Sequence, residues 1–142
     1  MTRQRTSFAS NPDVRDRMQR QARRDTDLER SLRSALHRRG LRYRLQIQLI
    51  PRRTSDIVFP KARVVVDVRS CFWHGCSSHC TIPQSNHDWW AAKFARTVQR
   101  DRDTEDRLRA AGWTVMVVWE HDSIERAADD ITSQVKQRYN LD

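Results

Sequence analysis

The stretch from Val64 to Val68, VVVDV, places four valines around a single aspartate. Valine favours strands, and an apolar run without polar alternation is typical of a strand that is covered on both faces. Such a strand lies in the middle of a sheet, with further layers on each side. Burying the Asp67 carboxylate there costs several kcal/mol unless a cation or a metal compensates. The run therefore predicts a layered fold and an unusual carboxylate.

Hydrophobic periodicity and turn residues predict the other elements. Apolar residues at helical spacing follow the capping box TDLE and stop at Gly40, which predicts a helix. Alternating residues after it predict an edge strand, and short apolar runs predict central strands. We expect an α/β fold with a central mixed sheet flanked by helices. In chain order the expected ranges are a helix over 26–40, strands over 41–49, 56–59 and 64–68, a helix over 88–111, a strand over 113–119 and a helix over 123–139.

Positive charge is concentrated in the first third of the chain. The 142 residues have a net charge of +9, and residues 1–44 hold 13 arginines against 5 acidic residues. This excess favours a polyanionic partner, most simply nucleic acid, with an arginine-rich solubilising tail as the alternative. We predict a basic DNA-binding arm over residues 1–24, flexible when free, and a single domain over residues 25–142.

The sequence has no run that approaches the roughly 20 apolar residues of a membrane span, and its N-terminus lacks the apolar core of a secretory signal. We therefore expect a cytoplasmic protein that makes no membrane contact and, with DNA as its partner, associates with the nucleoid. Thiols stay reduced in the cytoplasm, so the three cysteines favour a metal site over a disulfide framework.

Two aspartates accompany the predicted central strands. Asp56 opens one strand, and Asp67 lies eleven residues later, inside the next. A strand places Asp67 and Arg69 on the same face, because they are two residues apart. This spacing approximates the Asp…(Asp/Glu)-x-Lys pattern of restriction-endonuclease-like nucleases, whose clustered carboxylates hold divalent cations for phosphodiester cleavage. Glu29 can add a carboxylate from the first helix. The alternative for Asp67 is a salt bridge with an arginine.

The segment SCFWHGCSSHC, residues 70–80, contains all three cysteines and two of the five histidines. Zinc prefers four such ligands in a tetrahedral arrangement. Reduced structural thiols without a metal are the alternative. The candidate zinc ligands are Cys71, Cys76, His79 and Cys80, the last two competing for one place, with His121 as a distant fourth.

Two large aromatic residues, Phe72 and Trp73, lie between the first two cysteines. Metal ligands on either side would hold them rigidly, so that they can wedge between DNA bases. Covering the sheet is the alternative role for such side chains.

Seven short motifs together resemble the very-short-patch repair (Vsr) family of mismatch endonucleases. Their order and spacing agree with the family across most of residues 18–121, and CFWHGC with WEH is a specific combination. The resemblance implies a restriction-endonuclease-like fold with structural Zn²⁺, and an enzyme that uses Mg²⁺ to nick one DNA strand beside a T:G mismatch. The motifs are RDTDLE (24–29), SDIV (55–58), CFWHGC (71–76), WAAK (90–93), RDR (100–102), AGW (111–113) and VWEH (118–121).

The resemblance also implies roles for individual positions. Asp56 matches the family's catalytic metal ligand, and Val68 takes the place of a residue whose carbonyl oxygen touches the metal. His74 matches a histidine that contacts metal-bound water, and Glu29 matches a helical glutamate near the site. In the DNA interface, Phe72 and Trp73 match an aromatic wedge, Met18 a methionine entering from the opposite groove, and Lys93 a mismatch-reading lysine. Zinc-ligand positions are matched by Cys71, Cys76 and His121, with His79 or Cys80 completing the set.

Three positions depart from the family pattern. Thr97 replaces an asparagine four residues after the reading lysine, which bears on T:G preference. Arg69 replaces a catalytic histidine or aspartate. It cannot act as a base at neutral pH, but its charge can stabilise the transition state. Asp67 stands where an apolar aromatic residue is known, so we hypothesise that it joins Asp56 in a two-carboxylate magnesium site.

We expect a monomer that acts on double-stranded DNA containing a mismatch, with a mismatch-repair protein as a partner. Two alternatives remain. A related restriction or defence nuclease would keep Asp56 and His74 but recognise other DNA. A non-catalytic, zinc-stabilised DNA-binding module would need neither residue.

Overall fold

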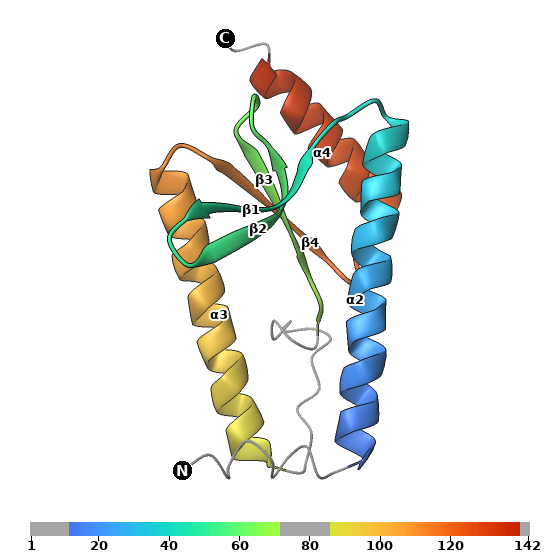
Figure 1. Ribbon diagram of the computed structural model, residues 1–142, viewed down its shortest axis with the longest axis vertical. Coiled ribbons are helices and arrows are strands. Elements are labelled where there is room, and N and C mark those ends of the chain that lie inside the picture. Colours follow the sequence, from blue (N-terminus) through green and yellow to red (C-terminus); the bar gives the residue numbers. More distant parts are fainter. Residues whose placement is uncertain (1–11, 72–85, 140–142) are drawn as a thin grey trace.

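The computed structural model describes residues 12–71 and 86–139 of the chain (Figure 1). Within these ranges, none of the helices combines the length and the apolar character that crossing a membrane requires. In chain order the elements are α2 (Pro12–Arg38), β1 (Arg44–Ile50), β2 (Arg53–Phe59), β3 (Val64–Arg69), α3 (His87–Ala110), β4 (Thr114–Trp119) and α4 (Ile124–Tyr139).

The four strands form one mixed sheet in the order β1-β2-β3-β4. The pairs β1/β2 and β2/β3 are antiparallel, whereas β3 and β4 run parallel. A parallel pair needs a long crossover, and here α3 lies between the two strands in sequence. The predicted mixed α/β sheet with flanking helices is confirmed, as is its order of elements.

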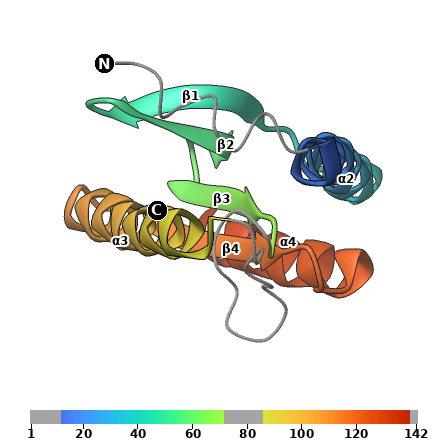
Figure 2. The ribbon, with the colours of Figure 1, turned by 90° about the horizontal axis from the view of Figure 1, so that it is seen from below.

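Helices cover both faces of the sheet. Residues of α2 and α4, such as Leu36 and Ile131, form one core with Val64 and Val66 of β3. On the other face, Val65 packs with Leu108 of α3. Accordingly, α2 and α3 lie on opposite sides of β3 (Figures 1 and 2). The three valines are fully buried. The prediction that VVVDV is a central, doubly covered strand is therefore confirmed.

Alternation along β3 determines which way its polar residues point. Val64 and Val66 face α2 and α4. Alternate residues of a strand point to opposite faces, so Val65, Asp67 and Arg69 lie together on the α3 side. Asp67 keeps a side-chain exposure of 16% and Arg69 one of 9%. The two charged residues thus lie at the end of a buried strand.

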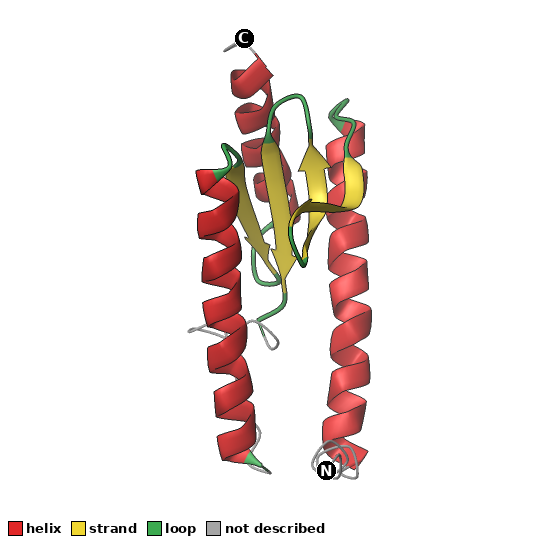
Figure 3. Ribbon diagram, turned by 60° about the vertical axis from the view of Figure 1, so that its left-hand side comes forward, coloured by secondary structure: helices red, strands yellow, loops and turns green. Residues whose placement is uncertain are grey.

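Helix α2 begins at Pro12 rather than near Thr26. Its N-terminal half extends beyond the sheet (Figures 1 and 3), and among the described residues the buried core of α2 begins at Leu32. Arginine and glutamine, which favour helices, make up seven of the 14 residues from 12 to 25. Helical structure therefore crosses the boundary predicted between residues 24 and 25. The division into a basic arm and an endonuclease domain stays a prediction.

Candidate active site

Asp56 lies where β2 and β3 separate. The last paired residues of these strands are Ile57 and Val66, so Asp56 is the first residue of β2 beyond the ladder. Its Oδ2 accepts a hydrogen bond of 2.9 Å from the backbone N–H of Val68. The carboxylate thus occupies the fork between the strands, next to the residue predicted to offer a carbonyl to a metal.

A glutamine connects Asp56 with the first helix. The register of β1 and β2 puts Gln46 opposite Asp56, and Gln46 Nε2 lies 3.4 Å from Asp56 Oδ1 and 3.5 Å from Glu29 Oε1. Its backbone has a φ of 52°, in the left-handed region that non-glycine residues rarely occupy. Such strain is characteristic of functional sites. Gln46 therefore holds two of the predicted site carboxylates side by side.

Sequence reasoning missed Gln46. It occupies a polar position in an alternating strand, which indicates only a solvent-facing side chain. Its positive φ could not be predicted from the residue type, because glycine and asparagine are the residues that usually adopt this conformation. A single sequence offered no means of finding it.

The charge of Asp56 raises the pKa of two neighbouring carboxyl groups. Burial, followed by the charge of Asp56, raises the pKa of Asp67 from its ordinary 3.8 to about 6, against an opposing effect of Arg69. Burial and the charge of Asp56 also raise the pKa of Glu29, which Arg33 and Gln46 partly offset. A site of crowded carboxylates that resist ionisation is one that a divalent cation would stabilise.

The donor set suits magnesium. Mg²⁺ is usually held by one or two carboxylates, with water and substrate phosphate filling the remaining places. Asp56 and Asp67 provide such a pair of oxygen ligands. Across residues 12–71 and 86–139, no group of three or more histidine, cysteine, aspartate or glutamate side chains is arranged to hold a metal. A magnesium ion would therefore need DNA and water to complete its coordination.

Arg69 is held by acidic side chains of β3 and α3. Its Nη2 donates to Glu105 at 3.0 Å and lies 3.9 Å from Asp67, while its Nε lies 3.8 Å from Asp101. Its guanidinium also lies over the ring of Trp119 in β4, 5.9 Å from the centroid. Both alternatives predicted for Asp67 thus have a geometric basis, because it is near an arginine and near Asp56.

Two predicted zinc ligands lie together beyond the ends of β3 and β4. Cys71 Sγ is 3.2 Å from His121 Nδ1, close to the roughly 3.5 Å between two ligands of a tetrahedral zinc ion. His121 Nε2 lies 3.5 Å from Asp122 Oδ1, and a zinc-bound histidine typically donates its second N–H to such a carboxylate. The pair fits one side of a zinc site. Cys76, His79 and Cys80 lie outside the described residues.

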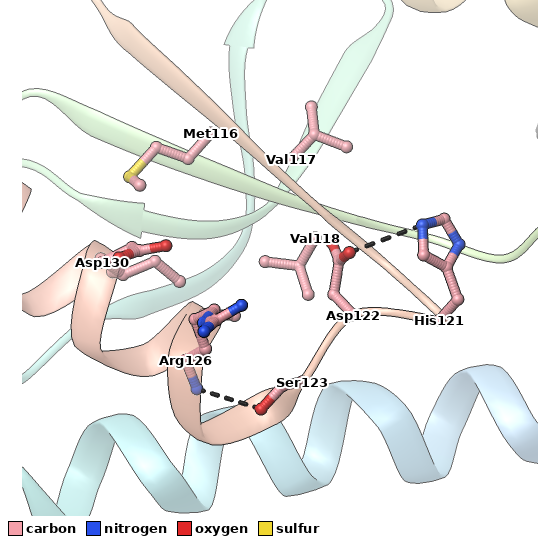
Figure 4. Close-up of a pocket in the computed structure, with 10 residues that line it drawn as sticks. Met116, Val117, Val118, His121, Asp122, Ser123, Arg126 and Asp130 are labelled. Carbon is pink, nitrogen blue, oxygen red and sulfur yellow. Dashed lines mark hydrogen bonds and ion pairs between the residues drawn. The ribbon is translucent and has the colours of Figure 1, made fainter.

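His121 also borders a pocket of about 360 Å³ between β4 and α4 (Figure 4). Its lining combines apolar residues of β4, such as Met116, with Arg126 and Asp130 of α4. None of the residues predicted for catalysis lines it. The pocket is therefore separate from the carboxylate site.

The remaining predicted DNA contacts fall in two groups. Phe72, Trp73 and His74 lie outside the part of the chain that the structure describes. Lys93 and Thr97 lie one turn apart on α3, where Thr97 Oγ1 donates to the Lys93 carbonyl at 3.0 Å and the Lys93 ammonium lies 5.7 Å from the centre of the Trp89 ring. Met18 is half-buried on α2. The N-terminal halves of α2 and α3 project past the sheet in the same direction (Figures 1 and 3).

Sequence comparison finds DNA endonucleases among the known relatives of this chain. The family model described as DNA mismatch endonuclease Vsr matches residues 5–81, more than half of the chain. The type II nicking enzyme V.NaeI of Lentzea aerocolonigenes is 40% identical over 78% of this chain and 69% of its own length. V.XorIIP of Xanthomonas oryzae is 41% identical over 72% of this chain and 76% of its own length. The DNA mismatch endonuclease Vsr of Escherichia coli is 38% identical over 70% of this chain and 64% of its own length.

The match to the family model runs through the Asp56 fork and the cysteine segment, and the relatives extend it over most of the chain. The resemblance read from the sequence motifs is thereby confirmed. This chain belongs to the Vsr family of DNA endonucleases.

Proposed function

We propose that this protein is a magnesium-dependent endonuclease that nicks one strand of duplex DNA beside a T:G mismatch. The observation that carries the proposal is the fork between β2 and β3, where Asp56 is hydrogen bonded to Val68 N–H and linked through Gln46 to Glu29. A relative named a DNA mismatch endonuclease supports a mismatched target. The T:G pair is what the resemblance of the sequence motifs implies.

In this mechanism Asp56 and Asp67, with the Val68 carbonyl, would hold Mg²⁺. When bound, the ion would supply an activated water and charge stabilisation for the leaving oxygen. Gln46 orients Asp56 and keeps Glu29 beside it. His74 accepts the proton of the attacking water, since the pKa of histidine lies near neutrality. Arg69, bound to Glu105, contributes by its charge and by positioning Asp67.

Zinc has a separate, structural role in the proposal. Cys71 and His121 hold it together with Cys76 and either His79 or Cys80. A bound ion would brace the segment that carries Phe72, Trp73 and His74. Phe72 and Trp73 would then wedge into the duplex, aided by Met18 from the other groove. Lys93 and Thr97 read the mismatch from α3.

A second candidate is a nicking enzyme with a different DNA target. Two relatives are named type II nicking enzymes, and Thr97 stands where the family has an asparagine. The single O–H of Thr97 donates to the Lys93 carbonyl within the helix, whereas asparagine carries two N–H donors and a carbonyl acceptor. This difference favours a changed preference at the mismatch.

The test compares matched and T:G-mismatched covalently closed plasmids, with Mg²⁺ and with EDTA. We expect conversion to the open circular form only for the mismatched plasmid with Mg²⁺, and none by an Asp56→Ala variant. Equal nicking of both plasmids would favour the second candidate, and binding without nicking would favour a DNA-binding module. An Asp67→Ala variant with full activity would refute Asp67 as a magnesium ligand.

A further inference from the structure

A basic hollow lies on the C-terminal half of α2, outside the residues assigned above to catalysis, zinc binding and mismatch recognition. It is open and has a volume of about 420 Å³. A single face of the helix, turned away from the core, lines it. Its helical residues recur at intervals of three and four, which places them on one face. We call it the α2 groove; its lining residues are Arg30, Arg33, Ser34, His37, Arg38 and Tyr43.

The α2 groove holds cationic groups, and two of them lack an ion pair within the described part of the chain. Arg38 is bound to Glu125 of α4 at 3.0 Å, and this pair joins the two helices. Arg30 and Arg33 form no ion pair with any side chain placed within residues 12–71 and 86–139. Two guanidinium groups on one exposed face are therefore available to a ligand.

Tyr43 makes one wall of the α2 groove rigid. Its hydroxyl donates to the Arg33 carbonyl at 3.2 Å, and its ring meets the buried Phe59 edge-on, with 6.1 Å between centroids. The His37 ring meets the same tyrosine in an edge-to-face arrangement, with 6.4 Å between centroids. Because these contacts fix the Tyr43 ring, the hollow beside the two arginines keeps its shape without a ligand.

The α2 groove continues from the active site. Arg33 lies one helical turn after Glu29, and its charge lowers the pKa of that residue. From Glu29 to His37 the helix rises about 12 Å along its axis. This length corresponds to roughly three to four nucleotides of duplex, at about 3.4 Å for each nucleotide of a strand.

We propose that the α2 groove binds backbone phosphates of the substrate duplex, about one to four nucleotides from the cleaved bond. Arg30 and Arg33 make the charged contacts, which suit arginine because its planar fork matches phosphate oxygens. Such contacts fix the position of the duplex and do not read its sequence. The inference rests on the proposed function, because it needs DNA to be cleaved at Asp56.

The test measures DNA binding at several salt concentrations, in the Asp56→Ala background so that no cleavage occurs. Each lost phosphate contact lowers the slope of log K against log salt by about 0.9. We expect the Arg30→Gln/Arg33→Gln variant to lower it by roughly 2, and Arg30→Lys/Arg33→Lys to retain most of it. The matched control is Arg126→Gln/Lys136→Gln on α4, which removes two exposed charges outside the groove and should leave the slope unchanged.

Methylphosphonate substitution locates the contact. Neutralising the phosphates about one to four nucleotides from the nick should weaken binding of the parent protein but not of the Arg30→Gln/Arg33→Gln variant. An unchanged salt slope in this variant, with its melting temperature also unchanged, overturns the groove proposal. Failure of the parent protein to bind or nick any duplex would instead overturn the proposed function, and the groove proposal with it.

Discussion

At the scale of single residues, Gln46 shows how the site is held under strain. A left-handed backbone costs roughly 1–2 kcal/mol in a residue with a Cβ atom. The structure retains it because the amide bridges Glu29 and Asp56. Glycine at this position would relieve the strain but lose the bridge.

We expect Gln46→Ala and Gln46→Gly both to slow single-turnover nicking by roughly tenfold or more, since each removes hydrogen bonds to charged groups. The two variants differ in stability. Gln46→Gly should melt at a higher temperature than Gln46→Ala, because only glycine adopts the positive φ without cost. Parent-like nicking by both variants would show that the bridge does not position the carboxylates.

The second prediction concerns the ionisation of Asp67. Its pKa is about 6 in the folded protein, against 3.8 ordinarily, so the folded state binds this proton more tightly than the unfolded state does. The ionised carboxylate therefore reduces stability, and this effect grows from about pH 4 until it is complete above about pH 6.

We expect Asp67→Asn to raise the free energy of unfolding at pH 8 without metal by up to about 3 kcal/mol, with little gain at pH 4. Urea unfolding at the two pH values measures this. The exposed Asp130→Asn is the control and should show neither effect. Magnesium should stabilise the parent protein and not Asp67→Asn; a gain of the same size at both pH values would contradict the assignment.

At the scale of elements, Arg69 joins β3 to α3. Its guanidinium is 9% exposed and faces Glu105, Asp67 and Asp101. Removing one partner of a buried pair leaves the other charge uncompensated, at about 3–5 kcal/mol. Replacing both partners avoids most of that cost.

We expect Arg69→Met to lower stability by about 3 kcal/mol or more, and Arg69→Met/Glu105→Gln to recover part of the loss. Denaturant unfolding gives the stabilities, and plasmid nicking separates two roles for the arginine. If Arg69 only positions β3 against α3, the double variant regains activity along with stability. A stable double variant that remains inactive would instead support a direct contribution of its charge to the reaction.

At the scale of the whole molecule, the sequence predicts the features that depend on the burial of apolar side chains. The strand VVVDV, the order of elements and the mixed sheet follow from hydrophobic patterns that the core requires. The start of α2 was missed because residues 12–25 contain only three apolar residues, which gives a weak periodic signal. Gln46 was missed because a strained backbone and a cross-strand bridge depend on partners brought together only by the fold. For Asp67, residue spacing alone could not separate an ion pair from a metal ligand, and the fold places both Arg69 and Asp56 nearby.

The ends of β3 and β4 carry the two described residues of the proposed zinc site. Cys71 follows β3 and His121 follows β4, and Glu120 Oε1 accepts a hydrogen bond of 3.1 Å from Cys71 N–H. A metal bound here would join two parallel strands at the edge of the catalytic fork. Its free energy of binding would add to the free energy of folding.

We therefore expect the purified protein to contain one zinc ion by atomic emission, and a strong chelator to lower both its melting temperature and its nicking activity. Magnesium alone should not restore nicking, whereas zinc followed by magnesium should, because the two ions occupy different donor sets. His121→Ala should reproduce the chelator's effect, and His87→Ala, at an exposed histidine that begins α3, should not. A zinc-free protein with an unchanged melting temperature and full magnesium-dependent nicking would leave Cys71 and His121 as a hydrogen-bonded pair without a metal.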